Sequence, residues 1–357
     1  MNNKEKVLVA MSGGVDSSFA ADRLQKQGFE VTGVHFLLWR PEPAAGKDRE
    51  LPSPEQSAKK SAEQVGIDLR VIDLREKFRK QIVEYFLNDY LSGRTPNPCS
   101  LCNPKIKFAA LLELADEMGA RHIGSGHYAR VIFDACRSEH QLREANDKSK
   151  DQSYFLAMLD QKILSRMVFP LGEMKKSEVK KEAAALGLES ASREESQDVC
   201  FVFSKNYADL IEAHRPGAEK SGDAIDISGN KIGVHKGIYR YTIGQHRGLA
   251  MNQPDLFVVA IDAPNNRIVV DKEKYLFHRK MKVSGMNWMT ALNFPFDCHA
   301  KIRYRFEKAE CRVERMEGDA FVATFSTPQR AITPGQSAVF YREDRVIGGG
   351  WIESAFD

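Results

Sequence analysis

The feature that most constrains this chain is a short apolar run near residue 7 that leads directly into a glycine turn. Val7 to Ala10 are apolar and suit a strand that is buried on both faces. Ser12-Gly13-Gly14 follows, where two residues without a Cβ atom let the backbone approach a ligand closely. After Asp16, apolar residues recur at helical spacing, at Phe19, Ala20 and Leu24. A strand, a glycine turn and a helix in this order direct backbone N–H groups and a helix N-terminus toward an anion.

The residues of the turn exclude two well-known phosphate-binding loops. No Gly-Lys-Ser/Thr follows the turn, and Gly-x-Gly-x-x-Gly does not occur in it. The hydroxyl-rich run from Ser12 to Ser18 instead resembles the pyrophosphate loop (PP-loop) of the ATP pyrophosphatases, which split ATP into AMP and pyrophosphate. Ser12, Ser17 and Ser18 can donate hydrogen bonds to phosphate oxygens, and Asp16 can hold Mg²⁺ beside them. A tight turn without a ligand is the alternative that so short a motif leaves open.

The composition is that of an ordinary globular protein with free thiols. A length of 357 residues favours two or three domains, and 42% hydrophobic and 28% charged residues are typical values. The net charge of +3 means that a nucleic-acid partner would be met by local basic patches. No apolar run reaches the roughly 20 residues of a transmembrane helix, and no secretory segment opens the chain. Six irregularly spaced cysteines do not indicate a disulfide scaffold, so we expect a cytoplasmic protein without a membrane partner.

Strand and helix patterns alternate over the first 190 residues and predict a doubly wound α/β fold with a parallel sheet. Strands are expected at 31–38, 69–72 and 122–125, and helices at 57–65, from 78 to near 93, and around 108–115. Ligands of such sheets bind at the carboxyl ends of the strands, where the Ser12 loop lies. After residue 200 the pattern changes to short strand-like runs broken by turn residues, which predicts an antiparallel barrel or sandwich.

Cys99 and Cys102 stand in a proline-rich context that favours reactive thiols. The run from Gly93 to Asn103 has two prolines before them and lysines follow, and we expect Cys102 where the next helix begins. A helix N-terminus and nearby lysines lower the pKa of a thiol and make it a better nucleophile. Half of a zinc site and a buried structural thiol are the other interpretations. Zinc is disfavoured because no second Cys/His pair at ligand spacing occurs in the sequence.

A series of motifs then occurs in one order along almost the whole chain. They are Ser-Gly-Gly-Val-Asp-Ser (12–17), Gly-Arg-Thr-Pro-Asn-Pro (93–98), Leu-Cys-Asn (101–103), Ile-Lys-Phe (106–108), Gly-His-Tyr (126–128), Lys-Asp-Gln-Ser-Tyr-Phe-Leu (150–156), Phe-Pro-Leu-Gly (169–172), Ser-Gln-Asp-Val-Cys-Phe (196–201), Thr-Ile-Gly-Gln (242–245) and Thr-Pro-Gly-Gln (333–336). In these motifs the chain resembles the tRNA-specific 2-thiouridylase family, enzymes that replace the C2 oxygen of the wobble uridine of tRNA by sulfur. The resemblance implies a PP-loop ATP-binding catalytic domain (1–200), a small central domain (201–277) and a C-terminal β-barrel (278–357).

The resemblance also implies a reaction that uses two of the cysteines. The C2 oxygen of uracil is a poor leaving group, so ATP adenylates it and pyrophosphate departs; a sulfur nucleophile then attacks C2 and AMP leaves. Cys200 would carry the incoming persulfide, supplied by a donor such as a cysteine desulfurase or a sulfur-relay protein. Cys102 would release the sulfur and form a disulfide with Cys200. Many relatives have an acidic residue where Cys99 stands, so Cys99 is interpreted as a base contact, and a redox pair with Cys102 stays open as the competing interpretation.

The remaining functional residues follow from the same motifs. Residues expected to hold ATP, together with Mg²⁺, are Ala10, Met11, Ser12, Gly13, Gly14, Val15, Asp16, Ser17, Phe36 and Gly126. Residues expected to contact tRNA are Asn97, Pro98 and Cys99 around the target base, and His127, Lys150, Asp151, Gln152, Arg303, Tyr304 and Gln336 elsewhere. Lysine and arginine suit phosphates, and tyrosine suits stacking or a sugar contact. Taken singly, such polar residues are more often solvated surface groups. Cys136, Cys298 and Cys311 match no motif and are interpreted as structural.

Three alternatives remain open. Another PP-loop ATP pyrophosphatase, such as an amidating or lysidine-forming ligase, shares the Ser12 loop but has no need of paired cysteines. A non-catalytic RNA-binding or redox-sensing protein is disfavoured by the intact Ser-Gly-Gly-Val-Asp-Ser, because packing does not require that loop. A paralogue with altered tRNA preference is conceivable because Ser53 to Ala58 stand where relatives have an acidic or cysteine-rich stretch.

Overall fold

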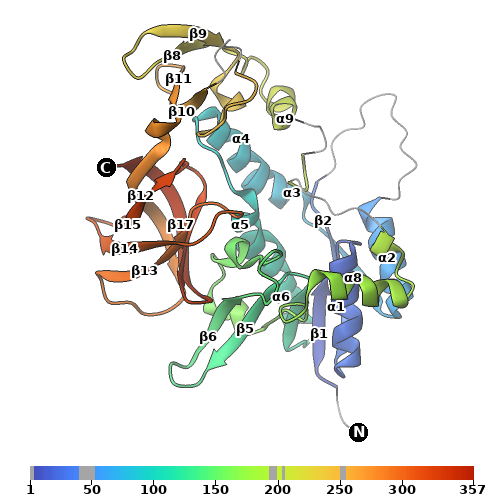
Figure 1. Ribbon diagram of the computed structural model, residues 1–357. Coiled ribbons are helices and arrows are strands. Elements are labelled where there is room, and N and C mark those ends of the chain that lie inside the picture. Colours follow the sequence, from blue (N-terminus) through green and yellow to red (C-terminus); the bar gives the residue numbers. More distant parts are fainter. Residues whose placement is uncertain (1–3, 40–52, 193–198, 203–205, 250–254) are drawn as a thin grey trace. The chain divides into compact units, whose positions relative to one another are not determined.

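The computed structural model describes residues 4–39, 53–192, 199–202, 206–249 and 255–357 (Figure 1). The chain forms two compact units, and neither is continuous in sequence. The first unit comprises residues 1–80, 99–201 and 344–347, and the second comprises 81–98, 202–343 and 348–357.

A five-stranded parallel sheet forms the centre of the first unit. Its order is β3 (Asp68–Asp73), β2 (Glu30–Leu37), β1 (Lys6–Ala10), β4 (His122–Ser125) and β7 (Met167–Val168), with parallel pairing throughout. The chain moves outward from β1 to β3 and then returns to β4 on the other side of β1. The strand order therefore reverses between β1 and β4, which is the place where sheets of this kind bind ligands. The predicted doubly wound parallel fold is confirmed.

Local sequence signals set the limits of the first helices of this unit. Helix α1 (Val15–Lys26) packs its buried Ala21 and Leu24 against β1. Helix α2 (Pro54–Val65) begins with a capping box, in which Ser53 Oγ accepts from the backbone N–H of Gln56 (3.1 Å) and Gln56 Oε1 accepts from that of Ser53 (2.7 Å). It ends at Gly66, whose left-handed φ of +76° suits glycine.

The other helical segments of this unit are short. They are α3 (Arg75–Phe78), α6 (Ala109–Glu117), α7 (Gln161–Leu164), α8 (Lys176–Ala185), the 3₁₀ turns η3 (Ser153–Leu156) and η4 (Glu189–Ser192), and α5 (Pro98–Cys102), which continues as a π-helix, η2 (Asn103–Phe108). A second π-helix, η1 (Arg79–Val83), stands between α3 and α4 (Glu84–Leu91). The long helix predicted from residue 78 is therefore a succession of α and π turns.

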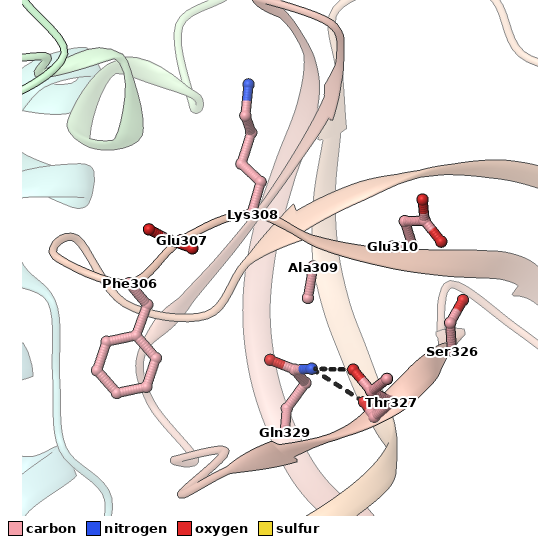
Figure 2. Close-up of a pocket in the computed structure, with 8 residues that line it drawn as sticks. All are labelled: Phe306, Glu307, Lys308, Ala309, Glu310, Ser326, Thr327 and Gln329. Carbon is pink, nitrogen blue, oxygen red and sulfur yellow. Dashed lines mark hydrogen bonds between the residues drawn. The ribbon is translucent and has the colours of Figure 1, made fainter.

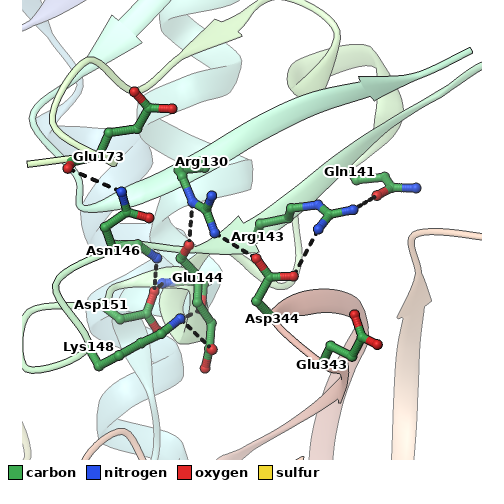
Figure 3. A network of polar contacts seen from close by, with 12 residues as sticks. Arg130, Gln141, Arg143, Glu144, Asn146, Lys148, Asp151, Glu173, Glu343 and Asp344 are labelled. Carbon is green, nitrogen blue, oxygen red and sulfur yellow. Dashed lines mark hydrogen bonds and ion pairs between the residues drawn. The ribbon is translucent and has the colours of Figure 1, made fainter.

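A hairpin of β5 (Ala129–Asp134) and β6 (Glu139–Glu144) belongs to the first unit and is not indicated by the sequence patterns. Asp344 binds it: the guanidinium groups of Arg130 and Arg143 donate to its two carboxylate oxygens, at 2.6 and 2.9 Å (Figure 3). Next to it, Arg345 pairs in register with Arg143 and donates to Glu139 at 2.5 Å. A segment from near the end of the chain thus completes the first unit.

The second unit contains a small mixed sheet of the order β10 (Leu256–Asp262), β11 (Arg267–Lys272), β8 (Gly222–Ile225) and β9 (Lys231–His235). Its core includes Val258, Ile268 and Val270, all fully buried. Helix α9 (Tyr207–His214) and α4 meet through Tyr207 and Tyr90, whose rings stack at 4.3 Å between centroids. The short turns η5 (Ile238–Arg240) and η6 (Glu273–Leu276) complete this region.

Six antiparallel strands close into a barrel. Their order is β12 (Phe277–Trp288), β15 (Phe321–Arg330), β14 (Ala309–Arg315), β13 (Phe296–Lys301), β16 (Ser337–Arg342) and β17 (Arg345–Phe356), and β12 also pairs with β17. Closure of this kind leaves the ring of strands without an open edge. Trp288 lies among the rings of Phe294, Phe296, Phe321 and Phe340, at 5.3 to 5.7 Å between centroids. The predicted C-terminal β-barrel is confirmed.

Candidate active site

The glycine turn after β1 forms a tight cradle at the start of α1. Gly13 has a φ of +80°, a left-handed conformation that favours glycine. A Cβ atom at Gly13 would also lie 2.7 Å from Cβ of Ser57 and 2.8 Å from N of Ala58, both in α2. Position 13 therefore requires glycine for two reasons: its left-handed conformation and the close approach of helix α2.

Serine hydroxyls hold the turn in shape. Ser17 Oγ donates to the carbonyl of Gly14 (3.0 Å) and lies 3.2 Å from both N and Oγ of Ser12. Ser18 Oγ donates to the same carbonyl at 3.0 Å. Ser17 and Ser18 are buried and Ser12 is exposed. Of the three hydroxyls, that of Ser12 is therefore the most open to an incoming phosphate.

Asp16, in the first turn of α1, is held from two sides. Lys176 Nζ, at the start of α8, lies 2.6 and 2.7 Å from the two carboxylate oxygens, and Tyr128 OH donates to Oδ1 at 2.8 Å. Lys176 is only 6% exposed, and an ammonium removed from water in this way requires a charged partner. Sequence reasoning missed both Lys176 and Tyr128 as neighbours of Asp16. Both carboxylate oxygens of Asp16 accept from Lys176 in this structure, and coordination of Mg²⁺ by Asp16 stays a prediction.

The other residues predicted to hold ATP lie at the same edge of the sheet. Ala10 pairs with Ser125 at the end of β4, directly before Gly126. A Cβ atom at Gly126 would lie 2.6 Å from the backbone carbon of Asp16, so β4 ends against the start of α1. Phe36 is partly buried near the end of β2. The structure thus brings the segment 10–17 and Gly126 together at the switch point and places Phe36 on the neighbouring strand.

Cys99 and Cys102 lie on α5, but not as the sequence predicts. The helix begins at Pro98, so Cys102 is its last residue and Cys99 lies in its first turn. The expectation that Cys102 benefits from a helix N-terminus is therefore wrong. Cys102 is buried and Cys99 half-buried, and burial raises the pKa of both thiols, that of Cys102 to about 12. Both thiols are therefore protonated at neutral pH in this structure.

Lys107, on the π-helix η2, carries a charge that acts on three thiols. It works against the effect of burial and favours the thiolate of both Cys99 and Cys102. Burial works against the ammonium of Lys107 itself, but Cys102, Cys200 and Cys99 together raise its pKa above the ordinary value. The sequence analysis expects the lysines after Cys102 to favour the thiolates, and Lys107 acts in that direction, although burial outweighs it.

His127 lies beside the same lysine. Burial, with the charge of Lys107 in addition, lowers the pKa of His127 to about 3, so its ring is neutral at pH 7. Its Nδ1 lies 2.8 Å from Ser125 Oγ, and its ring meets those of Phe108 and Phe169 at 5.7 and 6.3 Å. A neutral imidazole suits hydrogen bonding to a base or sugar better than it suits a phosphate.

Cys200 is exposed, and its neighbour Phe201 is buried. The ring of Phe201 packs edge-on against Phe78, with 5.5 Å between centroids, and anchors this short segment in the first unit. All six cysteines are free, so the disulfide between Cys102 and Cys200 does not occur in this structure and stays a prediction. The predicted Ser196-Gln197-Asp198 part of the motif lies outside the described residues.

Lys150, Asp151 and Gln152 lie in the loop between β6 and η3, drawn in part in Figure 3. Asp151 is 3% exposed and accepts from the backbone N–H of Ala145 (2.9 Å) and from Ser153 Oγ (2.8 Å). Gln152 exchanges hydrogen bonds with the backbone of Tyr128 at 2.8 and 3.0 Å. These bonds shape the loop, and a contact of the three residues with tRNA stays a prediction.

The remaining predicted tRNA contacts form a cluster within the second unit. Gln336 Nε2 donates to the carbonyl of Thr95 (2.9 Å), and Asn97 Nδ2 donates to Ser337 Oγ (3.1 Å). Arg303 donates to the carbonyl of Ile243 (2.8 Å) and to Thr333 Oγ1 (2.5 Å), with Tyr304 next to it. The structure thus brings the Pro-Asn-Pro segment and the Thr-Pro-Gly-Gln motif of residues 333–336 together.

A hollow of about 380 Å³ on the barrel is formed by other residues (Figure 2). Its lining consists of Phe306, Glu307, Lys308, Ala309, Glu310, Ser326, Thr327 and Gln329, and so includes no residue of the predicted sites. Within the described part of the chain, no group of three or more His, Cys, Asp or Glu side chains is arranged to hold a metal ion. Neither feature offers a competing active site.

Three family models match successive parts of the chain. One described as a tRNA methyl transferase HUP domain matches residues 5–204, one described as a tRNA methyl transferase PRC-barrel domain matches 209–272, and one described as an aminomethyltransferase beta-barrel domain matches 278–352. A solved 4-thiouridine synthetase–RNA complex with bound ATP is similar over 55% of this chain and 44% of its own, at 17% identity and a TM-score of 0.35. At that score the two structures are too far apart for their sites to be compared.

Curated relatives are similar over almost their full length. The tRNA-specific 2-thiouridylase MnmA of Syntrophotalea carbinolica is 45% identical to this chain, over 99% of the chain and 100% of its own length. The enzyme of the same name from Treponema denticola is 43% identical over 98% of both, and that from a Roseiflexus species is 42% identical over 97% of this chain and 99% of its own. With this identity over the whole length, and with the PP-loop and the cysteine-bearing helix in place, the chain belongs to the tRNA-specific 2-thiouridylase family.

Proposed function

We propose that this protein is a tRNA-uridine 2-sulfurtransferase, which uses ATP to convert the wobble uridine of tRNA to 2-thiouridine with release of AMP and pyrophosphate. The observation that carries the proposal is the presence, in one compact unit, of a PP-loop at the switch point of the sheet and of three thiols under the charge of one lysine. A nucleotide-binding turn alone would fit any PP-loop ligase, whereas the thiols fit sulfur transfer. The near-full-length similarity to named 2-thiouridylases supports the same function.

ATP is proposed to bind the segment from Ala10 to Ser17, with Gly126 and Phe36 beside it. The turn is already held in shape by its own hydrogen bonds, and its backbone N–H groups lie at the start of α1. Donors fixed in advance stabilise the charge that develops on phosphate during adenylation. We further propose that Mg²⁺ arrives on the phosphates of ATP, with Asp16 kept as the partner of Lys176.

Sulfur transfer is proposed to pass through Cys200 and Cys102. The terminal sulfur of a Cys200 persulfide attacks C2 of the adenylated uridine, and AMP leaves. The Cys102 thiolate then attacks Sγ of Cys200, the bond between that atom and the transferred sulfur breaks, and its electron pair stays with the sulfur on C2. The Cys102–Cys200 disulfide that results is reduced by an external thiol before the next cycle. The persulfide donor is proposed to be a cysteine desulfurase or a sulfur-relay protein.

We propose that tRNA binds the residues that the motifs assign to it. Asn97, Pro98 and Cys99 are assigned to the target base; the other assigned contacts are His127, Lys150, Asp151, Gln152, Arg303, Tyr304 and Gln336. The neutral ring of His127 and the hydrogen-bonding groups of Arg303 and Gln336 support these assignments, although several of them also bind the protein itself.

The division into domains 1–200, 201–277 and 278–357 is retained as a proposal, supported by family models that end and begin near the same residues. Among the helices of the described residues, none is long and apolar enough to span a membrane. A cytoplasmic location is proposed because tRNA and free thiols both occur there.

Reconstitution tests the proposed function. The purified protein is incubated with unmodified tRNA, ATP, Mg²⁺, a cysteine desulfurase, cysteine and a reductant, and the tRNA nucleosides are analysed by mass spectrometry. We expect 2-thiouridine with the wild type, none with Cys200→Ser, and unchanged formation with Cys136→Ser, because Cys136 is exposed and outside the proposed site. Formation of pyrophosphate without any 2-thiouridine would favour a different PP-loop ligase instead.

A further inference from the structure

Tyr128 is the last residue of the Gly-His-Tyr motif and the one to which the proposed function gives no role. Its hydroxyl donates to Asp16 Oδ1 at 2.8 Å. Its backbone N–H donates to Gln152 Oε1 at 3.0 Å, and its carbonyl accepts from the N–H of Gln152 at 2.8 Å. Tyr128 is only 2% exposed. One buried residue therefore binds both the segment assigned to ATP (residues 10–17) and the loop assigned to tRNA (residues 145–152).

Lys176 makes a second connection between the same two segments. Its Nζ lies 2.6 and 2.7 Å from the carboxylate oxygens of Asp16, and its backbone N–H donates to Asp147 Oδ2 at 2.9 Å. The other carboxylate oxygen of Asp147 accepts from Ser149 Oγ at 2.6 Å. The carbonyl of Asp147 accepts from the N–H of Lys150, a predicted tRNA contact, at 3.1 Å. Asp16 is therefore joined to the tRNA loop through Lys176 as well as through Tyr128.

These connections run through closely packed structure. Val15, which precedes Asp16, shares one hydrophobic cluster with Tyr128 and with Ala145 of the tRNA loop, and none of the three is more than 5% exposed. A Cβ atom at Gly126 would lie 2.6 Å from the backbone carbon of Asp16, so the end of β4 touches the first turn of α1. Close-packed interiors transmit a displacement instead of absorbing it. A shift of the tRNA loop therefore reaches the start of α1, and the converse also holds.

Each substrate would act on one end of these connections. Asp16 lies in the first turn of α1, where the phosphates of ATP are proposed to bind. A phosphate there repels the Asp16 carboxylate and attracts the Lys176 ammonium. A tRNA phosphate beside Lys150 attracts the side chain of a residue in the turn that Asp147 holds. Both substrates therefore act on the same set of hydrogen bonds.

We propose that Tyr128 and Lys176 are positioning residues that couple the ATP segment to the tRNA loop, so that bound tRNA tightens the binding of ATP. The proposal rests on the proposed function and adds to it a means by which adenylation is favoured once the tRNA is in place. The tRNA fixes the loop, and through it Asp16, so that ATP meets a turn that needs less ordering. Coupling between binding free energies is reciprocal, so ATP tightens the binding of tRNA by the same factor.

Equilibrium binding of a nucleotide that cannot be adenylated tests this coupling without any sulfur transfer. The Kd of α,β-methylene-ATP with Mg²⁺ is measured by calorimetry on the full-length reduced protein, without tRNA and with a saturating unmodified tRNA transcript. The Kd of the transcript is measured by filter binding, without and with the saturating analogue. Tyr128→Phe removes only the hydroxyl that reaches Asp16, and Asp147→Ala removes the side chain that accepts from the N–H of Lys176.

Each variant has a matched control. Tyr154→Phe removes the hydroxyl of another buried tyrosine of the same unit, 1% exposed. Asn146→Ala changes the exposed neighbour of Asp147, whose Nδ2 donates to the carbonyl of Glu173 at 3.3 Å (Figure 3). Neither control residue is assigned to ATP or to tRNA. Circular dichroism shows whether each variant is folded, and if one of the two test variants does not fold, the other decides.

In wild type we expect tRNA to lower the Kd of the analogue at least about fivefold, which is the lower end of typical couplings, and the analogue to lower the Kd of tRNA equally. Both test variants should bring this factor toward one, and both controls should retain it. The Kd of the analogue alone should change little in Tyr128→Phe, because Lys176 still holds Asp16. A merely structural role would weaken binding equally with and without the second substrate and leave the factor unchanged.

An unchanged factor in the folded test variants would overturn the proposal. A factor of one in wild type that binds both the analogue and tRNA would overturn it as well, and would leave the proposed function standing. Failure of the proposed function looks different: wild type would then bind no tRNA at any concentration of the analogue, and this proposal would fall with it.

Discussion

The Sγ atoms of Cys298 and Cys311 lie 3.7 Å apart, on residues that face each other directly across strands β13 and β14. Both side chains are buried, and a hydrogen bond with Cys298, together with burial, raises the pKa of Cys311 well above its ordinary value. The interpretation of both as structural thiols agrees with this burial, but their separation also allows them to be joined by oxidation.

We predict that mild peroxide converts this pair slowly to a disulfide, two thiols and one peroxide giving one disulfide and two waters. The reaction is slow because a buried neutral thiol is a poor nucleophile. The disulfide would close the loop from Cys298 to Cys311. Closing a loop of about 15 residues stabilises a fold by about 3 kcal/mol if no strain results. Peptide mass spectrometry would detect the loss of two hydrogens, and Cys298→Ser serves as control. Complete absence of the cross-link after prolonged oxidation would contradict the prediction.

Gly13→Ala is predicted to destroy ATP binding. It should also destabilise the first unit by more than the strain of a positive φ alone would cause, because the added Cβ atom meets helix α2. Gly28 offers a matched control because it also has positive φ, +98°, but a Cβ atom there would meet nothing within 4 Å. Gly28→Ala should reduce the free energy of unfolding by about 1 kcal/mol. Urea unfolding and equilibrium ATP binding would compare the two, and equal losses of stability would show that the approach of α2 is unimportant.

Lys176→Met is predicted to reduce stability by about 1–3 kcal/mol, because it leaves the partly buried carboxylate of Asp16 without its cation. Asp16 is about a third exposed, which keeps the loss below that of a fully buried pair. Lys175→Met, at an exposed neighbouring position, should have little effect. In a double-mutant cycle, Asp16→Asn should recover part of the loss caused by Lys176→Met. Strictly additive effects would argue that the two residues do not interact.

Asp16→Ala is predicted to abolish the release of pyrophosphate that accompanies adenylation. The substitution removes the carboxylate at the start of α1 to which Lys176 and Tyr128 donate. A coupled assay for pyrophosphate in the presence of tRNA measures this directly. Undiminished turnover would remove Asp16 from the nucleotide site.

The stability of the protein should fall on acidification in part because of His127. Its pKa is lowered from 6.5 to about 3 in the folded state, so between these values the unfolded chain binds the extra proton. Stability must then decrease as the pH falls through 6.5 toward 3, by up to about 1.4 kcal/mol per pH unit. His127→Gln removes this contribution but leaves those of the carboxylates. Urea unfolding from pH 4.5 to 7 should therefore give a shallower dependence in the variant, and identical slopes would contradict the assignment.

Binding of tRNA is predicted to weaken steeply with salt, although the net charge is only +3. Each phosphate neutralised by a lysine or arginine releases counter-ions, so the logarithm of the binding constant should fall linearly with the logarithm of the salt concentration. Filter binding over a salt series measures the slope. A flat response, or equal affinity for duplex DNA, would count against tRNA as the substrate.

Features that are set by residues adjacent in sequence could be predicted, whereas contacts between residues far apart in sequence could not. The Val7–Ala10 strand, the Gly13 turn and helix α1 are set by neighbouring residues, and the structure confirms them. The pairing of Asp16 with Lys176 joins residues 160 positions apart, and no pattern in one sequence indicates such a contact. Hairpin β5–β6 has no clear strand pattern in the sequence, because β5 carries three apolar residues in a row without alternation and β6 is almost entirely polar or charged.

The misplaced start of the cysteine helix has a different cause. Proline is common as the first residue of a helix, and Pro98 occupies that place, four residues before Cys102, where the sequence analysis expects the helix to begin. The consequence was chemical: Cys102 was expected to have an activated thiol, whereas burial holds its pKa at about 12. Lysines near the thiols could be predicted from the sequence, but the π-helix that carries Lys107 could not, because no sequence pattern indicates one.

The contribution of residues 344–347 to the first unit bears on how the protein is made. A ribosome releases the nucleotide-binding strands first, and domains usually fold as they emerge. Here Arg130 and Arg143 lack the carboxylate of Asp344 until strands β12 to β16 have been synthesised. The first unit therefore finishes folding only after five of the six barrel strands have been synthesised, and a nascent chain arrested before that point lacks the carboxylate that joins Arg130 and Arg143.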